Sequence, residues 1–294
     1  MARPQDRWTD AHGNPVDEAD RGLVYDVRTL VSRRRALGLF SGIGVGALAA
    51  GCGLVDPADS GGGTTTTSGP RPSGSAGSSV TSASGDLTEV PDETAGPFPG
   101  DGSKGIDVLD DSGIVRRDLR STFGDAGTVT AEGVPLTVRL TVRDASTGDA
   151  RTGSAIYVWH CDREGRYSLY TPGLEDVNYL RGVQTVDDTG TATFTTVFPG
   201  CYQGRWPHIH FEVYADAADA TRDGPIVKTS QIALPKEACD LVYATDGYEQ
   251  SVSALAGVSL STDLVFSDDG GIHQIASMSG SADDGYVAAL TIGV

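Results

Sequence analysis

The sequence has little positive charge. Lys and Arg total 22 against 40 Asp and Glu, so the formal net charge is −18 at pH 7. A chain this negative lacks the excess of basic residues typical of a nucleic-acid-binding protein, and its charge does not attract it to anionic lipid. It also disfavours long-range steering of anionic small molecules toward the protein.

Long apolar runs are also missing. The apolar segment 36–50 is shorter than the ~20 residues of a membrane-spanning helix. It follows the twin-arginine-like segment 32–40 and ends at Cys52 in Leu-Ala-Ala-Gly-Cys, which looks like a bacterial lipobox. We therefore interpret residues 1–51 as a twin-arginine-type lipoprotein signal region with Cys52 lipidated; a simple cleaved signal or an uncleaved anchor is the alternative.

This signal region predicts a protein that is exported. It would be lipid-anchored on the outer face of the cytoplasmic membrane, or secreted, and would meet the membrane only through its lipid. Residues 52–88 are rich in Gly, Ser and Thr, which predicts a flexible tether. Residues 89–294 are enough for one domain with a substantial core.

Cysteine is scarce, and no pair has the Cys-x-x-Cys spacing of a zinc knuckle. With Cys52 acylated, Cys161, Cys201 and Cys239 remain, and they allow three different single disulfides. We favour Cys201–Cys239 because it would brace the short loop that carries Tyr202, but the spacing leaves all three pairings open.

The domain has the pattern of an all-β protein. Segments 136–142 and 191–197 alternate apolar and polar residues, as half-buried strands do. Many short strands separated by Gly-rich turns predict a single β-sandwich with few short helices. The other expected strands are 155–159, 208–214, 227–233, 259–266 and 286–292, and one short helix is expected at 235–243.

Two histidines within one apolar strand segment indicate a metal site. His208 and His210 are separated by one residue, so their side chains point to the same face of a strand. Tyr167 and Tyr202 lie in turns flanked by Gly or Pro and could add phenolates. Neutral nitrogens with anionic phenolate oxygens suit a hard, highly charged ion, so the set favours ferric iron over zinc.

These segments resemble the intradiol ring-cleavage dioxygenases, the catechol and protocatechuate type. The resemblance covers roughly residues 90–245 and suggests an exported, actinobacterial-type variant. It rests on Gly-x-Tyr at 165–167 after a Val-Trp-His strand, Pro-Gly-x-Tyr at 199–202, Arg-x-x-His-x-His at 205–210, and the entry segment Glu-Thr-Ala-Gly-Pro-Phe-Pro at 93–99. It implies that Fe(III) is bound by Tyr167, Tyr202, His208 and His210, with catalytic roles for Arg205, Gln231 and Tyr202.

The resemblance also implies a reaction of the EC 1.13.11 type. A catechol-type aromatic diol would be cleaved with O2 between its hydroxylated carbons, giving a muconate-type dicarboxylic acid. The negative net charge favours neutral catechols as substrates, although a local charge at Arg205 could override this preference.

Some alternatives remain open from the sequence. Only five residues separate Tyr202 from His208, fewer than in better-known relatives, but six extended steps span at most about 20 Å, which is enough to reach one metal. Tyr170 and Tyr179 are the substitute phenolates if Tyr202 turns away. A different function is a cell-surface β-sandwich binding protein that keeps a structural iron site. A zinc hydrolase is disfavoured because the sequence has no His-Glu-x-x-His motif.

Overall fold

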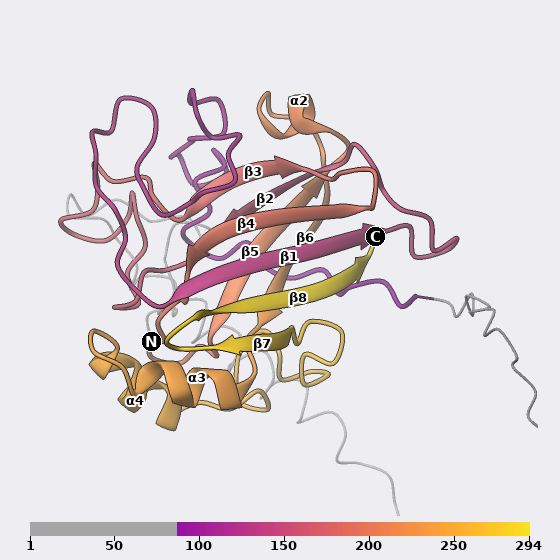
Figure 1. Cartoon of the computed structure of the whole chain (residues 1–294). Helices are drawn as coiled ribbons and strands as arrows, with labels where there is room; N and C mark the ends of the chain where they lie inside the picture. The colour runs from indigo at the N-terminus through magenta and orange to yellow at the C-terminus, as the bar shows by residue number, and fades with distance from the viewer. Residues whose placement is uncertain (1–86) are drawn as a thin grey trace, which may run out of the picture.

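A computed structural model describes residues 87–294 (Figure 1). The expected signal region, Cys52 and nearly all of the expected tether lie outside the described residues. In chain order the elements are β1 (Pro135–Arg143), β2 (Ala155–Trp159), β3 (Arg181–Thr185), β4 (Thr191–Val197), β5 (His208–Tyr214), α2 (Ala217–Ala220), β6 (Ile226–Ala233), α3 (Lys236–Tyr243), α4 (Glu249–Ala256), β7 (Ser277–Ser281) and β8 (Gly285–Gly293). The prediction of a mostly β chain with few short helices is confirmed.

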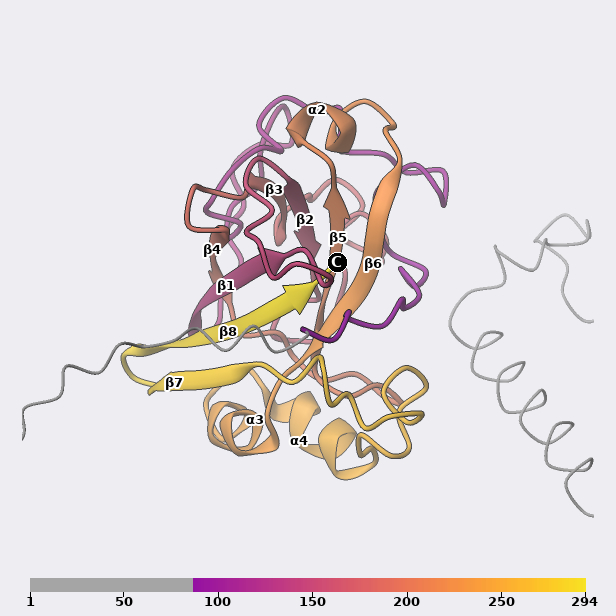
Figure 2. The ribbon, with the colours of Figure 1, turned by 90° about the vertical axis from the view of Figure 1, so that its right-hand side faces the viewer.

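The strands form two four-stranded sheets that lie face to face (Figure 2). One sheet has the order β4-β1-β8-β7, and the other has the order β3-β2-β5-β6. The last strand, β8, pairs in parallel with the first, β1, so the first and last strands are neighbours in one sheet. Apolar side chains of both sheets, such as Val138 and Leu140 from β1 and Ile156 and Val158 from β2, share one core.

Strand β5 is buried along its whole length, which a half-exposed sandwich strand would not be. Ile209, Phe211 and Val213 point into the core between the sheets. His208 and His210 alternate with them and therefore project from the opposite, outer face. Because that face is also buried, something other than the second sheet must cover it.

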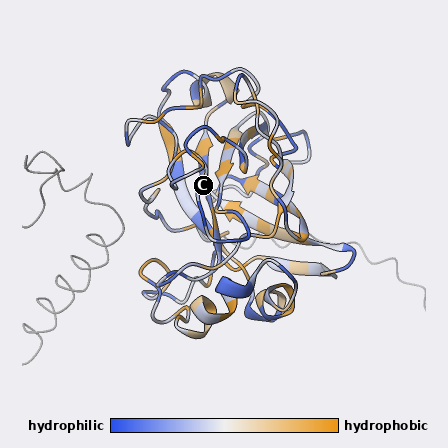
Figure 3. Ribbon diagram, turned by 90° about the vertical axis from the view of Figure 1, so that its left-hand side faces the viewer, coloured by the Kyte–Doolittle hydropathy of each residue, from blue (hydrophilic) through white to orange (hydrophobic). Residues whose placement is uncertain are grey.

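Loops cover the outer face of the β3-β2-β5-β6 sheet. A second apolar cluster joins Tyr157 and Trp159 of β2 to Val108, Ile114 and Phe123 from the segment that precedes β1. Figure 3 shows the apolar residues concentrated in the strands and the hydrophilic ones in the surrounding loops and helix surfaces. The outer face is therefore a second, smaller interior.

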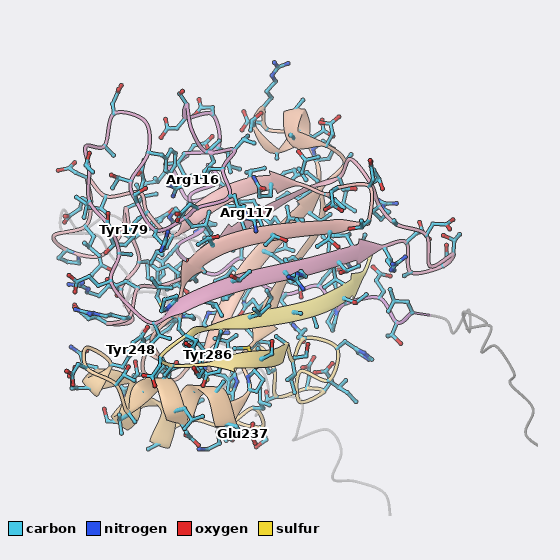
Figure 4. All side chains as sticks on the ribbon, viewed as in Figure 1. Arg116, Arg117, Tyr179, Glu237, Tyr248 and Tyr286 are labelled. Atoms are coloured by element: carbon cyan, nitrogen blue, oxygen red, sulfur yellow. The ribbon has the colours of Figure 1, made fainter. Side chains whose placement is uncertain are left out.

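The helices α3 and α4 pack beside the ends of the strands, next to β7 (Figures 1 and 2). Tyr248, just before α4, ties this helical segment to the sheets. Its hydroxyl accepts a hydrogen bond from the Val134 amide at 3.0 Å and donates one to the Phe198 carbonyl at 2.8 Å. In Figure 4, Tyr248 and Tyr286 lie between helices and strands, whereas Glu237 points away from the sheets.

One predicted strand is wrong. Residues 259–266 form consecutive turns, not a strand. The Ser259 carbonyl accepts hydrogen bonds from the amides of Thr262 and Asp263, and the Asp263 carboxylate accepts them from Val265 and Phe266. Short polar side chains that bond nearby backbone groups favour turns over strands, and here they outweigh the apolar pattern.

The favoured disulfide is also wrong, because Cys161, Cys201 and Cys239 are all buried free thiols. The Cys201 thiol donates to the Arg205 carbonyl at 3.4 Å, and the Cys239 thiol donates to the Leu234 carbonyl at 3.9 Å. The loop of Tyr202 is thus held by hydrogen bonds of Cys201, whose amide also donates to the Ser251 hydroxyl at 2.8 Å. Within residues 87–294, no helix has the length and apolar character needed to cross a membrane.

Candidate metal centre

Four predicted ligands come together on the outer face of the β3-β2-β5-β6 sheet. His208 and His210 stand at the start of β5, two residues apart on one face. Tyr167 comes from the loop after β2, and Tyr202 comes from the turn between β4 and β5. Three of the four side chains are buried, and only Tyr202 is partly exposed.

The donor atoms of these side chains converge on one point. The Nε2 atoms of His208 and His210 are 3.1 Å apart. The Tyr167 hydroxyl lies 3.4 Å from His208 Nε2, 3.2 Å from His210 Nε2 and 3.4 Å from the Tyr202 hydroxyl. The Tyr202 hydroxyl lies 3.1 Å from His208 Nε2.

These separations fit a shared metal ion. Nitrogen and oxygen ligands lie at about 2.1 Å from a bound ion. Two such ligands are therefore about 3.0 Å apart if their angle at the ion is about 90°, and about 3.6 Å apart if it is about 120°. All five separations between these donor atoms fall in this range. In the described part of the chain no group of three or more His, Cys, Asp and Glu could hold a metal, so the site depends on its tyrosines.

The two imidazoles are oriented by different contacts. His208 Nδ1 lies 2.6 Å from the Trp206 carbonyl, so Nδ1 carries the proton and Nε2 presents its lone pair to the centre. His210 stacks on the Trp159 indole, with ring centroids 4.8 Å apart and an interplanar angle of 6°. Trp159 faces His210 directly in the pairing of β2 with β5, so the register of the sheet sets this stack.

Burial disfavours the charged form of each of these four side chains. For the imidazoles it favours the neutral form, which binds a metal, whereas for the phenols it disfavours the phenolate, which is the form that would bind one. It lowers the pKa of His208 to about 3 and that of His210 well below its usual value. Both rings are therefore neutral at pH 7, which is the form that coordinates metals. Burial raises the pKa of Tyr202 to about 12 and that of Tyr167 well above its usual value. Phenolates here need compensating positive charge, which a trivalent ion would provide.

Arg205 lies beside the four donors, buried with 4% of its surface exposed. Its Nε donates to the Asp263 carboxylate at 2.9 Å, and one terminal nitrogen donates to the Gln231 side-chain carbonyl at 2.6 Å. The other terminal nitrogen lies 3.5 Å from His208 Nε2. The guanidinium is thus a fixed positive charge at the edge of the candidate centre.

Gln231 joins this centre to the predicted entry segment. It faces His210 across the pairing of β5 with β6, and its Nε2 donates to the Thr94 carbonyl at 2.9 Å. Two residues on, Gly96 has a φ of +73°, and a Cβ there would lie 3.4 Å from His210 Cε1. Phe98 then packs on Tyr167 with ring centroids 4.8 Å apart. The segment therefore covers the histidines and one tyrosine.

The substitute phenolates do not join the centre. The Tyr170 hydroxyl accepts a hydrogen bond from the Gly100 amide, and the Tyr179 hydroxyl donates to Asp162. His160 also stays apart, with its ring nitrogens on the Cys161 carbonyl and the Thr196 hydroxyl. The side chain that sequence analysis missed is Asp263, whose position within a supposed strand carried no signal of a site.

Comparisons with known proteins match part of this chain to dioxygenases. A family model described as "Dioxygenase" matches residues 117–223. A chlorocatechol 1,2-dioxygenase of Rhodococcus opacus is 34% identical over 94 residues, a match covering 26% of this chain and 36% of that protein. The chain thus matches about a third of the length of this curated relative.

Two solved structures share the fold. An intradiol ring-cleavage dioxygenase from Tetranychus urticae has a TM-score of 0.53 at 24% identity, over 70% of this chain and 94% of that one. A second dioxygenase has a TM-score of 0.54 at 23% identity, with the same coverage of 70% and 94%. The comparisons do not favour the binding-protein alternative.

Proposed function

With the intradiol dioxygenase family supported by these sequence and fold matches, we propose that the protein is a non-haem Fe(III)-dependent dioxygenase that cleaves a catechol-type ring with O2. The observation that carries the proposal is the convergence of the Tyr167, Tyr202, His208 and His210 donor atoms. In the reaction the bond between the two hydroxylated carbons breaks, and both atoms of O2 enter a muconate-type dicarboxylic acid. The balance needs no external reductant.

The four side chains would hold the ferric ion. When bound, it would supply Lewis acidity and a template for the aromatic diol. His208 and His210 enter as neutral donors, so the two phenolates carry the anionic charge of the protein ligands. This mixed set fits ferric iron better than zinc, whose usual protein ligands are Cys, His, Asp and Glu.

Tyr202 is suited to move a proton. It is partly exposed, whereas Tyr167 is fully enclosed. A hollow of about 750 Å³ lies beside its turn, lined also by Gly165, Gln203 and Ser253. We assign to the Tyr202 Oη the acceptance of a substrate hydroxyl proton, because this phenol has the most freedom to leave the centre.

Arg205 would stabilise negative charge that develops on the substrate during the reaction. Its guanidinium is buried, where electrostatic interactions are stronger than in water. Gln231 would help to orient the diol and also hold the guanidinium. The stacked Trp159 and the packed Phe98 would exclude water from the histidines and from Tyr167.

The test is O2 uptake by the iron-loaded protein over a panel of neutral and anionic catechols. We expect consumption of one O2 per ring and a dicarboxylic product that contains both oxygen atoms. Stoichiometric iron binding without O2 uptake on any catechol would instead favour the structural iron site of a binding protein.

We further propose that the enzyme works outside the cytoplasm, anchored through Cys52. The support is the twin-arginine-like segment 32–40 and the lipobox-like ending at Cys52. Cys52→Ser should move the protein from the membrane fraction to the soluble fraction, because the lipid supplies the anchoring free energy. Detergent, but not high salt, should release the unmutated protein. A variant that stays membrane-bound would contradict the lipobox interpretation.

A further inference from the structure

Asp263 is a buried carboxylate that neither the family match nor the sequence motifs reach. It lies in the turns after α4, 58 residues from Arg205 along the chain, and beyond the matched residues 117–223. Its side chain has 0% of its surface exposed. Burying a carboxylate is costly unless it is paired and hydrogen-bonded, so its partners show what it does.

Four donors share the two oxygens of Asp263. Oδ2 accepts from Arg205 Nε at 2.9 Å and from the Trp206 amide at 2.7 Å. Oδ1 accepts from the amides of Val265 and Phe266 at 2.8 and 3.0 Å. Burial alone would raise the pKa of Asp263, but Arg205 and the amide donors hold it below its usual value. The carboxylate is therefore an anion in a fixed position.

This anion bonds one nitrogen of the Arg205 guanidinium, and Gln231 bonds another. Asp263 takes the Nε–H, while the Gln231 carbonyl accepts from a terminal nitrogen at 2.6 Å. A planar group that is hydrogen-bonded through two of its three nitrogens is restrained in orientation, and its remaining nitrogen lies 3.5 Å from His208 Nε2. The turn at 259–266 is thereby coupled to the candidate centre.

We propose that Asp263 is a positioning residue for ring cleavage, acting through Arg205. This inference rests on the proposed function and goes beyond it, because Asp263 does not touch the four donor atoms. Its role is to align the guanidinium with the charge that develops on the substrate. A purely structural role would be limited to ordering the turn of Val265 and Phe266.

A double-mutant cycle on the iron-loaded protein separates these roles. Asp263→Asn removes the charge at nearly constant shape, and we expect kcat for catechol to fall about 10–100-fold with KM and iron content little changed. In an Arg205→Lys background the same change should cost far less, because lysine has no planar group to align. If Asp263→Asn lowers kcat by the same factor with Arg205 and with Lys at position 205, the inference is overturned.

Two further variants make the outcome decisive. Asp263→Ser keeps a short hydroxyl that can accept from Val265 and Phe266 but loses the contact with Arg205. It should fold and show the same kcat loss; full activity would overturn the inference. Asp144→Asn is the matched control, since Asp144 also accepts from turn amides and pairs with an arginine, Arg151, at 3.4 Å, away from the centre. It should leave kcat unchanged.

A second readout does not depend on turnover. The visible phenolate-to-iron band of the substrate-free protein should shift in Asp263→Asn, because the guanidinium beside His208 moves, and should not shift in Asp144→Asn. An unmutated protein that cleaves no catechol would refute the proposed function by itself. In that case a band identical in the unmutated protein and in Asp263→Asn would refute the positioning role as well.

Discussion

The two faces of strand β5 are packed by different kinds of interaction. On the inner face, Ile209, Phe211 and Val213 meet the other sheet in an apolar core. On the outer face, His208 and His210 meet tyrosines and an arginine delivered by loops. Both faces of the strand are buried. The inner face is stabilised by the burial of apolar surface, and the outer face is held by hydrogen-bond-range contacts between specific polar atoms.

This difference separates stability from chemistry within seven residues. Apolar burial stabilises the fold in proportion to area and tolerates changes that preserve volume. The outer face has no such tolerance, because each nitrogen or oxygen must point to one centre. Changes on the inner face should therefore reduce stability and leave iron binding intact. Changes on the outer face should abolish iron binding and leave stability largely intact.

The largest effect is expected from His210→Ala. Removal of this donor should abolish stoichiometric iron binding and reduce ring cleavage to background, and His208→Ala or Tyr167→Phe should do the same. Metal analysis of the purified variants checks this. Full iron content in all three variants would rule out the centre.

Phe211→Ala is the matched change on the inner face of the same strand. Loss of a fully buried ring should lower the free energy of unfolding by about 3–5 kcal/mol, since it removes apolar contacts and leaves a cavity. Denaturant unfolding measures this, and the folded fraction should still bind one iron. A variant of normal stability that loses iron would reverse the assignment of the two faces.

Arg205→Lys refines the comparison within the outer face. Lysine keeps the positive charge but has no planar group that could bond Asp263 and Gln231 through two separate nitrogens. We expect turnover to fall on the order of 10²–10³-fold, with iron content and catechol affinity nearly unchanged. Steady-state kinetics with a binding titration under anaerobic conditions decide this. Unchanged turnover would make Arg205 a residue without a catalytic role.

The smallest effect concerns Glu93 in the segment that covers the outer face. Burial first, then Asp268, raises the pKa of Glu93 to about 7. The folded protein therefore keeps a proton that the unfolded chain releases, so stability should decline as pH rises from about 4.5 to about 7. Glu93→Gln should flatten this part of the profile of melting temperature against pH. A profile identical to that of the unmutated protein would contradict the raised pKa.

The same contrast explains what could be predicted from the sequence. Strands β1, β2, β4, β5, β6 and β8 and helix α3 lie where the sequence predicted them. Strands β1 and β4 alternate apolar and polar residues with the period of a strand, and β2 is a short continuous apolar run. Strand β3 could not be predicted because Arg-Gly-Val-Gln-Thr has neither an apolar run nor an alternation. Its Arg181 is buried through hydrogen bonds to Ser168 and Pro99, which are distant in the chain. Strand β7, Ser-Met-Ser-Gly-Ser, was missed for the same lack of an apolar face.

The candidate site follows the same division. Tyr167, Tyr202, His208, His210, Arg205 and Gln231 could be selected because short motifs contain them, and the structure brings them together. Asp263 could not be selected, because its role comes from a contact 58 residues away in the chain. The apolar residues around it indicated a strand, whereas its carboxylate stabilises turns. Local patterns do not contain long-range pairing of this kind.

The most direct test of the central claim is the visible absorption spectrum of the iron-loaded protein. If Tyr167 and Tyr202 bind ferric iron as phenolates, the protein should show a phenolate-to-iron band that shifts when catechol is added without O2. The band should be lost in a variant carrying both Tyr167→Phe and Tyr202→Phe. A colourless protein with a full complement of iron, or a band that persists in that double variant, would contradict the claim.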